Sequence, residues 1–186
     1  LGSIAFTIVA DDADLDRAVP GAAMGVFTNS GQICYSGTRL FVQRSIQEEF
    51  VERLKRFSAT LKVGNGLHEG IDLGPLISQR QLDRVMGYVD IGPKEGATLA
   101  TGGTRLGGAL ASGYFVEPTV FANVNNEMTI AREEIFGPVI SVLPFDTVDE
   151  VLKMANDSEY GLGGGVWTCD LATAHQVSQG IHSGTV

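Results

Sequence analysis

The sequence has 186 residues, of which 44% are hydrophobic and 19% charged, and its formal net charge is −9. This length and composition predict a single globular domain and exclude a disordered chain. The acidic balance disfavours nucleic acid and anionic lipid as partners, and no apolar run is long enough to span a bilayer. With only two cysteines, Cys34 and Cys169, we expect free thiols, no metal cluster and a cytoplasmic location.

The first elements alternate between strand and helix patterns. A nearly continuous apolar run at 4–10 predicts a buried strand. Asp12 or Asp14 can cap the helix that should follow, since both precede a stretch of small apolar residues. A second strand is predicted at 38–43, after a turn that contains Cys34.

Two amphipathic helices should come next. The spacing of apolar residues predicts a helix over 45–61, and Ser45 with Glu48 has the capping-box spacing. The same spacing recurs at Ser78 and Gln81, ahead of a second apolar helical face. Both patterns place the helix start at the serine.

The rest of the chain repeats this alternation. Thr147 with Glu150 again has capping-box spacing and predicts a helix. The remaining strand candidates are short runs rich in apolar and β-branched residues, at 97–101, 114–124, 139–145, 163–168 and 184–186. Alternating strands and helices predict an α/β fold with three layers, α/β/α, and a mainly parallel twisted sheet. We find no repeat or linker, so residues 1–186 should form one domain.

The segment "NSGQICYSG", residues 29–37, places Cys34 in a turn of small polar residues. A lone cysteine is more often inert packing than a nucleophile, and it usually has apolar neighbours. Here Gly31 and Gly37 permit backbone conformations that other residues resist and leave room for a substrate. A backbone amide in such a turn can stabilise a developing oxyanion. Cys34 is therefore a candidate nucleophile.

Histidine would be the usual base for activating such a thiol. His68, His175 and His182 lie far from Cys34 in the sequence and in unrelated contexts. A cysteine–histidine dyad therefore has no positive support.

The segment "AREEIFGPV", residues 131–139, is the second candidate site. It sits at a predicted helix–loop–strand junction, where α/β proteins bind ligands. The Glu134 carboxylate can accept hydrogen bonds from sugar hydroxyls, and the Phe136 ring offers a flat apolar wall. The alternative is a solvated helix end without function.

Both segments carry a family resemblance. "FTNSGQICYSGTRLFV" closely resembles the catalytic-cysteine segment of the aldehyde dehydrogenase superfamily, and "MTIAREEIFGPVISVLPFDTVDEVLKMANDSEYGLGGGVWT" resembles its second hallmark. "LGSIAFTIVADDADLDRAV" and "GYFVEPTVFANV" match as well. The similarity covers essentially the whole chain, and the two long motifs stand in the family's order. The chain thus resembles the catalytic domain of that family.

The resemblance implies a function for each candidate residue. Cys34 would attack an aldehyde to form a thiohemiacetal, hydride would pass to NAD or NADP, and water would hydrolyse the thioester to a carboxylic acid. Glu134 would hold the nicotinamide ribose hydroxyls, and Phe136 would lie beside the nicotinamide. Gln81 and Arg84 would reach toward the adenosine side of the cofactor. Arg39 matches a residue with a structural or electrostatic role.

The resemblance also implies parts outside this sequence. Leu1 to Ser3 match the run that follows the family's general-base glutamate, so that glutamate would directly precede Leu1. The dinucleotide-binding domain would lie upstream, and the C-terminal oligomerisation segment of a homodimer or homotetramer would lie downstream. We therefore expect the 186 residues alone to be inactive. Two alternatives remain open: a coenzyme A-acylating relative and a noncatalytic structural relative.

Overall fold

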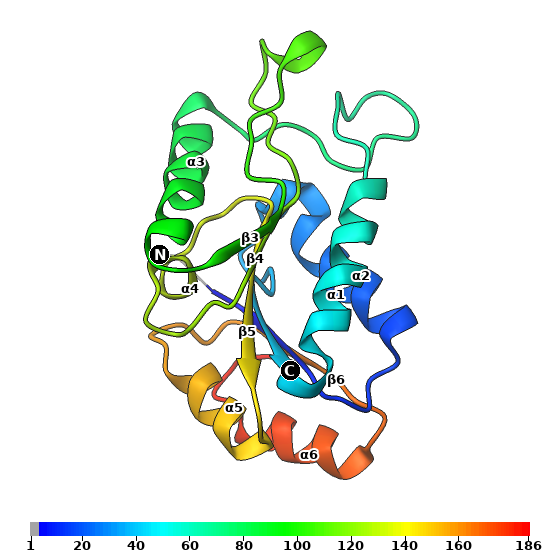
Figure 1. The fold of residues 1–186 in the computed structure, drawn as a ribbon, viewed down its shortest axis with the longest axis vertical. Helices are drawn as coiled ribbons and strands as arrows, with labels where there is room; N and C mark the ends of the chain where they lie inside the picture. The colour runs from blue at the N-terminus through cyan, green and yellow to red at the C-terminus, as the bar shows by residue number, and fades with distance from the viewer. Residues whose placement is uncertain (1–3) are drawn as a thin grey trace.

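A computed structural model describes residues 4–186 of the chain, which form a six-stranded sheet between two layers of helices (Figure 1). The strand order is β3-β4-β5-β2-β1-β6, and every neighbouring pair is parallel except β3 with β4. The strands are β1 (Phe6–Val9), β2 (Arg39–Gln43), β3 (Thr98–Thr101), β4 (Thr119–Ala122), β5 (Val139–Phe145) and β6 (Gly164–Trp167). The predicted α/β class and mainly parallel sheet are confirmed.

The helices cover both faces of this sheet. Helices α1 and α2 pack on one face, where Phe50 and Leu54 share a core with strand residues, and α3, α5 and α6 pack on the other, where Val85 and Val151 do the same (Figure 1). Their bounds are α1 (Leu15–Phe27), α2 (Gln47–Thr60), α3 (Gln79–Lys94), α4 (Thr129–Arg132), α5 (Val148–Asn156) and α6 (Leu171–Gly180). Because both faces are buried, the central strands are mostly apolar, with Arg39 and Ser141 as buried exceptions.

Three of the predicted helix starts are confirmed. Asp14 is the N-cap of α1, and Ser78 is the N-cap of α3 and accepts a hydrogen bond from the backbone N–H of Gln81 (3.2 Å). Thr147 and Glu150 form the reciprocal capping box of α5. Each cap satisfies a backbone donor that the first turn of a helix leaves free.

The predicted capping box at Ser45 and Glu48 is wrong. Residues Arg44–Ile46 form a 3₁₀ turn, and α2 begins only at Gln47. The Ser45 hydroxyl instead donates to the carboxylate of Asp11 (3.4 Å). A tertiary contact with the turn after β1 thus replaces the local cap.

Differences also appear among the strands. Of the predicted strand at 114–124, only β4 forms a strand, because Pro118 interrupts the run and residues before it make one isolated bridge, Arg105 to Val116. The structure assigns no strand at 184–186, although Thr185 accepts a hydrogen bond from the Gly164 N–H (2.8 Å). Helix α6, with only Val177 fully buried, has too weak an apolar pattern to be expected from the sequence.

Arg39 joins the sheet to α5 from inside the core. Its side chain is only 3% exposed, and its guanidinium donates to the carbonyls of Ala155 (2.9 Å) and Met154 (3.4 Å) in the last turn of α5. It lies over the rings of Phe6 and Phe41. A cation at a helix C-terminus is favoured by the helix dipole. Burial lowers the pKa of Arg39 to about 10, so it remains charged at neutral pH.

Arg39→Met should lower the free energy of unfolding by about 2 to 4 kcal/mol, because the buried Ala155 carbonyl loses the guanidinium donor and the Met154 carbonyl keeps only the Asn126 amide. Arg44→Met removes an exposed ion pair with Asp146 and should cost much less. Urea unfolding of both variants measures the difference. Equal losses would show that the buried contacts of Arg39 contribute little.

Candidate functional site

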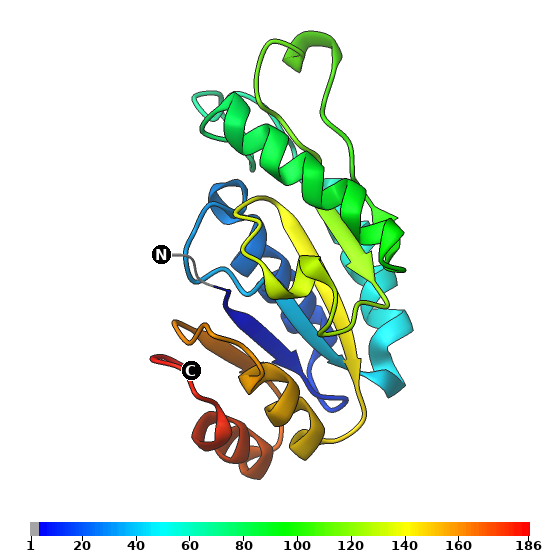
Figure 2. The ribbon, with the colours of Figure 1, turned by 90° about the vertical axis from the view of Figure 1, so that its left-hand side faces the viewer.

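Three of the five predicted site residues lie in loops that precede parallel strands: Cys34 precedes β2, and Glu134 and Phe136 precede β5. The other two, Gln81 and Arg84, lie on α3. Leu162, which was not predicted, precedes β6. Parallel strands have their amino ends at one edge of the sheet, as the view in Figure 2 shows. Ligands of open α/β sheets usually bind at the carboxyl ends. Here the candidate residues gather at the amino ends.

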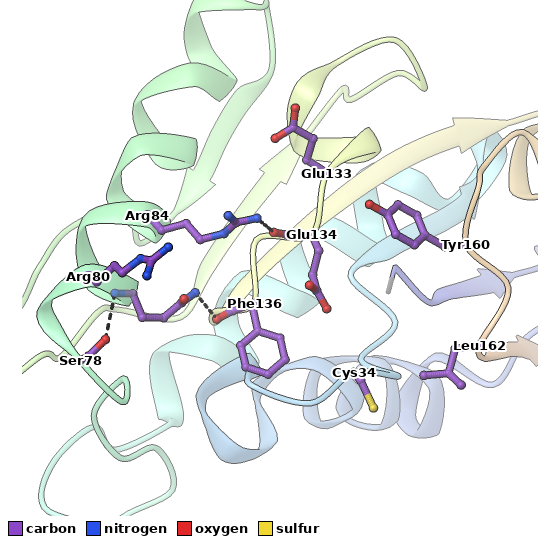
Figure 3. A pocket seen from close by; sticks show the side chains of 10 residues that line it. Cys34, Ser78, Arg80, Arg84, Glu133, Glu134, Phe136, Tyr160 and Leu162 are labelled. Carbon is purple, nitrogen blue, oxygen red and sulfur yellow. Dashed lines mark hydrogen bonds between the residues drawn. The ribbon is translucent and has the colours of Figure 1, made fainter. Parts of the chain in front are cut away.

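One cleft of about 1110 Å³ brings all five predicted site residues together (Figure 3). Its walls come from the cysteine turn, the start of α3, the segment before β5 and the segment before β6. The lining residues are Cys34, Ser78, Arg80, Gln81, Arg84, Glu133, Glu134, Phe136, Tyr160 and Leu162. The predicted residues, though far apart in the sequence, therefore face a common space.

Cys34 is exposed at this cleft and follows an unusual turn. Three successive residues adopt left-handed backbone angles, with φ of 53° at Asn29, 56° at Ser30 and 73° at Gly31. This conformation costs energy for residues with a side chain, so other contacts must hold it.

Two hydrogen bonds connect the turn to the chain before α3. The hydroxyl of Ser30, itself buried, donates to the carbonyl of Gly74 (2.8 Å). The side-chain oxygen of Gln32 accepts from the N–H of Ile77 (2.9 Å). Because Ser78 caps α3 directly after Ile77, the cysteine turn and the start of α3 are fixed relative to each other.

The turn also touches the segment before β5. A Cβ atom built on Gly31 would lie 1.9 Å from the carbonyl oxygen of Gly137, and one built on Gly137 would lie 2.5 Å from a methyl group of Val85. The backbone at Gly137 is therefore enclosed between the cysteine turn and α3. Only glycine permits this approach at either position.

Gly31→Ala should lower the free energy of unfolding by about 2 kcal/mol or more, because the new methyl group collides with backbone and φ is positive. Gly25→Ala is the matched control, since a Cβ there meets nothing within 4 Å and the residue lies inside α1. It should leave stability unchanged or raise it slightly. Thermal unfolding compares the two variants, and similar melting temperatures would show that the contact is not needed.

The segment that carries Glu134 and Phe136 is bonded to α3. The Gln81 amide donates to the carbonyls of Ile135 (3.0 Å) and Phe136 (2.9 Å), and Arg84 donates to the carbonyl of Glu134 (2.5 Å). Phe136 has a φ of 58°, and its ring lines the cleft (Figure 3). Gln81 and Arg84 thus contact the backbone of this segment.

Several lining residues were not expected from the sequence. Tyr160 and Leu162 belong to the glycine-rich run "YGLGGG", whose composition is typical of an ordinary loop. They reach the cleft because β6 pairs with β1 and β1 with β2, and no local pattern reveals that order. Arg80 is one residue from the predicted Gln81. Of the lining residues within 4–186, none is a histidine.

The model of the aldehyde dehydrogenase family matches residues 1–186, the whole chain. The chain belongs to the aldehyde dehydrogenase family. It is 50% identical to the betaine aldehyde dehydrogenase of Rhizobium etli (strain CIAT 652) over 186 residues, and 46% identical to the putative aldehyde dehydrogenase DhaS of Bacillus subtilis (strain 168). All of this chain is covered in both comparisons, but only 38% and 37% of these relatives.

Solved structures of this family have the same fold. The NAD⁺ complex of an aldehyde dehydrogenase from Bacillus cereus superimposes with a TM-score of 0.95 at 47% identity. A betaine aldehyde dehydrogenase from Staphylococcus aureus, also in complex with NAD⁺, superimposes with 0.96 at 40% identity. Both cover the whole of this chain, which spans 37% and 38% of theirs.

The described residues were also compared with the requirements of a metal site and of a membrane-spanning helix. Residues 4–186 contain no group of three or more His, Cys, Asp or Glu side chains placed to hold a metal ion. None of their helices is long and apolar enough to cross a membrane. Leu1 to Ser3, which match the run after the family's general base, lie outside the described residues.

Proposed function

We propose that residues 1–186 are the cysteine-bearing catalytic domain of an NAD(P)-dependent aldehyde dehydrogenase that oxidises an aldehyde to a carboxylic acid. The supporting observation is that Cys34, Glu134 and Phe136 line one cleft although they lie far apart in the chain. A noncatalytic relative would have no need to keep an exposed thiol, a carboxylate and an aromatic ring at a common cleft.

Cys34 acts as the nucleophile in this proposal. Its thiolate Sγ forms a bond to the carbonyl carbon, and the π electrons of the C=O bond move to oxygen, where the backbone N–H of Cys34 can stabilise the charge. When the carbonyl re-forms, the hydrogen on that carbon leaves with its electron pair. The resulting thioester is cleaved by water to the carboxylic acid, and the thiol of Cys34 is restored.

The cleft also suits a dinucleotide. A nicotinamide cofactor, when bound, accepts the hydride that leaves the thiohemiacetal carbon. Glu134, which is half-buried at the cleft, can accept hydrogen bonds from ribose hydroxyls, and the Phe136 ring provides an apolar surface for a flat heterocycle. We take NAD⁺ as the first cofactor to test, since the two solved relatives above are complexes with it.

Hydrolysis of the thioester needs a base, which we place in the chain before Leu1. The N–H of Arg39 donates to the carbonyl of Ala5 (3.4 Å), so the amino ends of β1 and β2 are adjacent. Chain that enters β1 therefore arrives at the same sheet edge as Cys34. We further propose that a dinucleotide-binding domain and an oligomerisation segment complete a homodimeric or homotetrameric enzyme.

Cys34→Ala should reduce aldehyde-dependent NAD⁺ reduction by the full-length protein by about a thousandfold or more, because no second thiol of residues 4–186 lines the cleft. Cys169→Ala removes the other exposed thiol, which lies next to the N-cap of α6, and should leave the rate unchanged. Absorbance at the nicotinamide band measures both. Undiminished activity in Cys34→Ala would refute the proposed nucleophile, and activity that requires coenzyme A would favour the acylating class.

Glu134→Gln should raise the KM for the nicotinamide cofactor by about tenfold, since the neutral amide is a weaker acceptor for ribose hydroxyls than a carboxylate. Glu48→Gln is the control, because Glu48 lies in α2 on the other face of the sheet. Initial rates at varied NAD⁺ provide the constants. An unchanged KM in Glu134→Gln would remove Glu134 from the cofactor site.

A further inference from the structure

A second cavity, of about 250 Å³, adjoins the cleft that contains Cys34. Glu133 and Tyr160 line both spaces, so these two residues form part of the wall between them. The rest of the lining comes from the first residue of β2, the turn before α4, the end of α4 and the loop 157–160 that follows α5. The second cavity therefore lies where the sheet meets a loop that reaches the cleft.

A buried cation lines this cavity. Arg39 is almost completely buried, and its two terminal nitrogens donate to carbonyls at the end of α5. Its third nitrogen, Nε, is also buried and has no hydrogen-bond partner among residues 4–186. Removing a charged N–H group from water is unfavourable unless another acceptor replaces the water. The Nε–H group of Arg39 therefore needs an acceptor in the cavity.

Asn126 presents the complementary group to the same cavity. Its amide nitrogen donates to the carbonyl of Met154 (2.8 Å), which fixes the orientation of the side chain. Its amide oxygen, Oδ1, is buried and accepts no hydrogen bond within the described part of the chain. The cavity is thus lined by one donor and one acceptor that the described protein groups leave unsatisfied.

The charges around the cavity restrict what can bind there. Arg39 and Arg132 line it and disfavour a metal cation, while Glu133, Asp157 and the oxygen of Asn126 disfavour an anion. A small neutral molecule that both accepts and donates hydrogen bonds satisfies both unpaired groups. Water has this chemistry, and one molecule occupies only about 30 Å³ in the liquid. Arg132 and Asp157 are exposed, so the cavity can fill from solvent.

We propose that this cavity is a structural water site, in which ordered water accepts a hydrogen bond from Arg39 Nε and donates one to Asn126 Oδ1. A buried water typically makes about three hydrogen bonds, and the Asp157 carboxylate at the same cavity offers a further acceptor. The site is a property of the fold and does not depend on the reaction that the cleft carries out.

The water connects the loop 157–160 to the sheet. Backbone bonds of this loop are local: the Ser158 N–H donates to the carbonyl of Asn156 (2.9 Å), and the Tyr160 N–H donates to the hydroxyl of Ser158 (3.1 Å). Figure 3 shows Tyr160 and Leu162 on the side of the cleft opposite Arg84. Water held between the loop and Arg39 therefore helps to place this wall of the cleft.

A high-resolution crystal structure of the full-length protein tests the site directly. We expect water within about 2.7–3.2 Å of Arg39 Nε and of Asn126 Oδ1, either as one molecule or as two that are bonded to each other. Crystals soaked in sodium bromide distinguish an anion site, because bromide at Nε would give an anomalous peak. A bromide peak beside Arg39, a direct bond from another side chain to Nε, or a cavity without ordered density would overturn the proposal.

Two variants of Asn126 test whether the water holds the loop. Asn126→Leu and Asn126→Asp both lose the N–H that bonds Met154, but the aspartate keeps an oxygen that accepts from water. Amides of residues 157–160 in the full-length protein should exchange about tenfold faster in Asn126→Leu than in Asn126→Asp, the effect of losing one net hydrogen bond. Equal exchange rates would refute the connection to the loop. If Asn126→Leu does not fold, the crystal structure of the unaltered protein still decides whether the water site exists.

Discussion

The contact between the backbones at Gly31 and Gly137 is the constraint on which the cleft depends. At 1.9 Å from a hypothetical Cβ to a carbonyl oxygen, no side chain fits between the two segments. Gly137 is confined on its other side by Val85 of α3. The cysteine turn, the segment with Glu134 and Phe136, and α3 therefore form one packed unit. A shift of any of the three would change the distance between the thiol and the proposed cofactor contacts.

The sheet explains why these segments meet. Strands β2 and β5 are parallel neighbours, so the loops that enter them emerge side by side at one edge. A side-chain contact at the same edge helps to hold β2 and β5 in register. Arg39 at the first position of β2 is bonded to the last turn of α5, the helix that follows β5. The buried residue Arg39 thus lies only five positions after the exposed Cys34. The strand carries the residue that stabilises the fold, and the turn carries the thiol that faces the cleft.

The helices and strands follow largely from local sequence patterns, but the contacts that bring their loops together at the cleft do not. Alternating apolar runs predict the α/β class, and Asp14 and Thr147 fix helix starts, because strands and caps depend on near neighbours. The glycines on either side of Cys34 also predict the cysteine turn. Strand order is a long-range property, so neither the arrival of Leu162 at the cleft nor the bonds from Gln81 to the loop carbonyls can be derived from spacing. The failure at Ser45 has the same cause, since a distant aspartate competes for its hydroxyl.

The strained backbone angles of this site lie in loops that more rigid elements hold in place. Asn29, Ser30 and Phe136 all hold left-handed angles, and all three lie in the two segments that carry the proposed chemistry. Such conformations persist only when surrounding contacts outweigh their cost. The required contacts come from elements with their own packing, above all α3, which is anchored by buried residues. The site is thus built from loops whose geometry is imposed by a helix, which gives an accessible thiol the fixed surroundings that the proposed covalent catalysis would require.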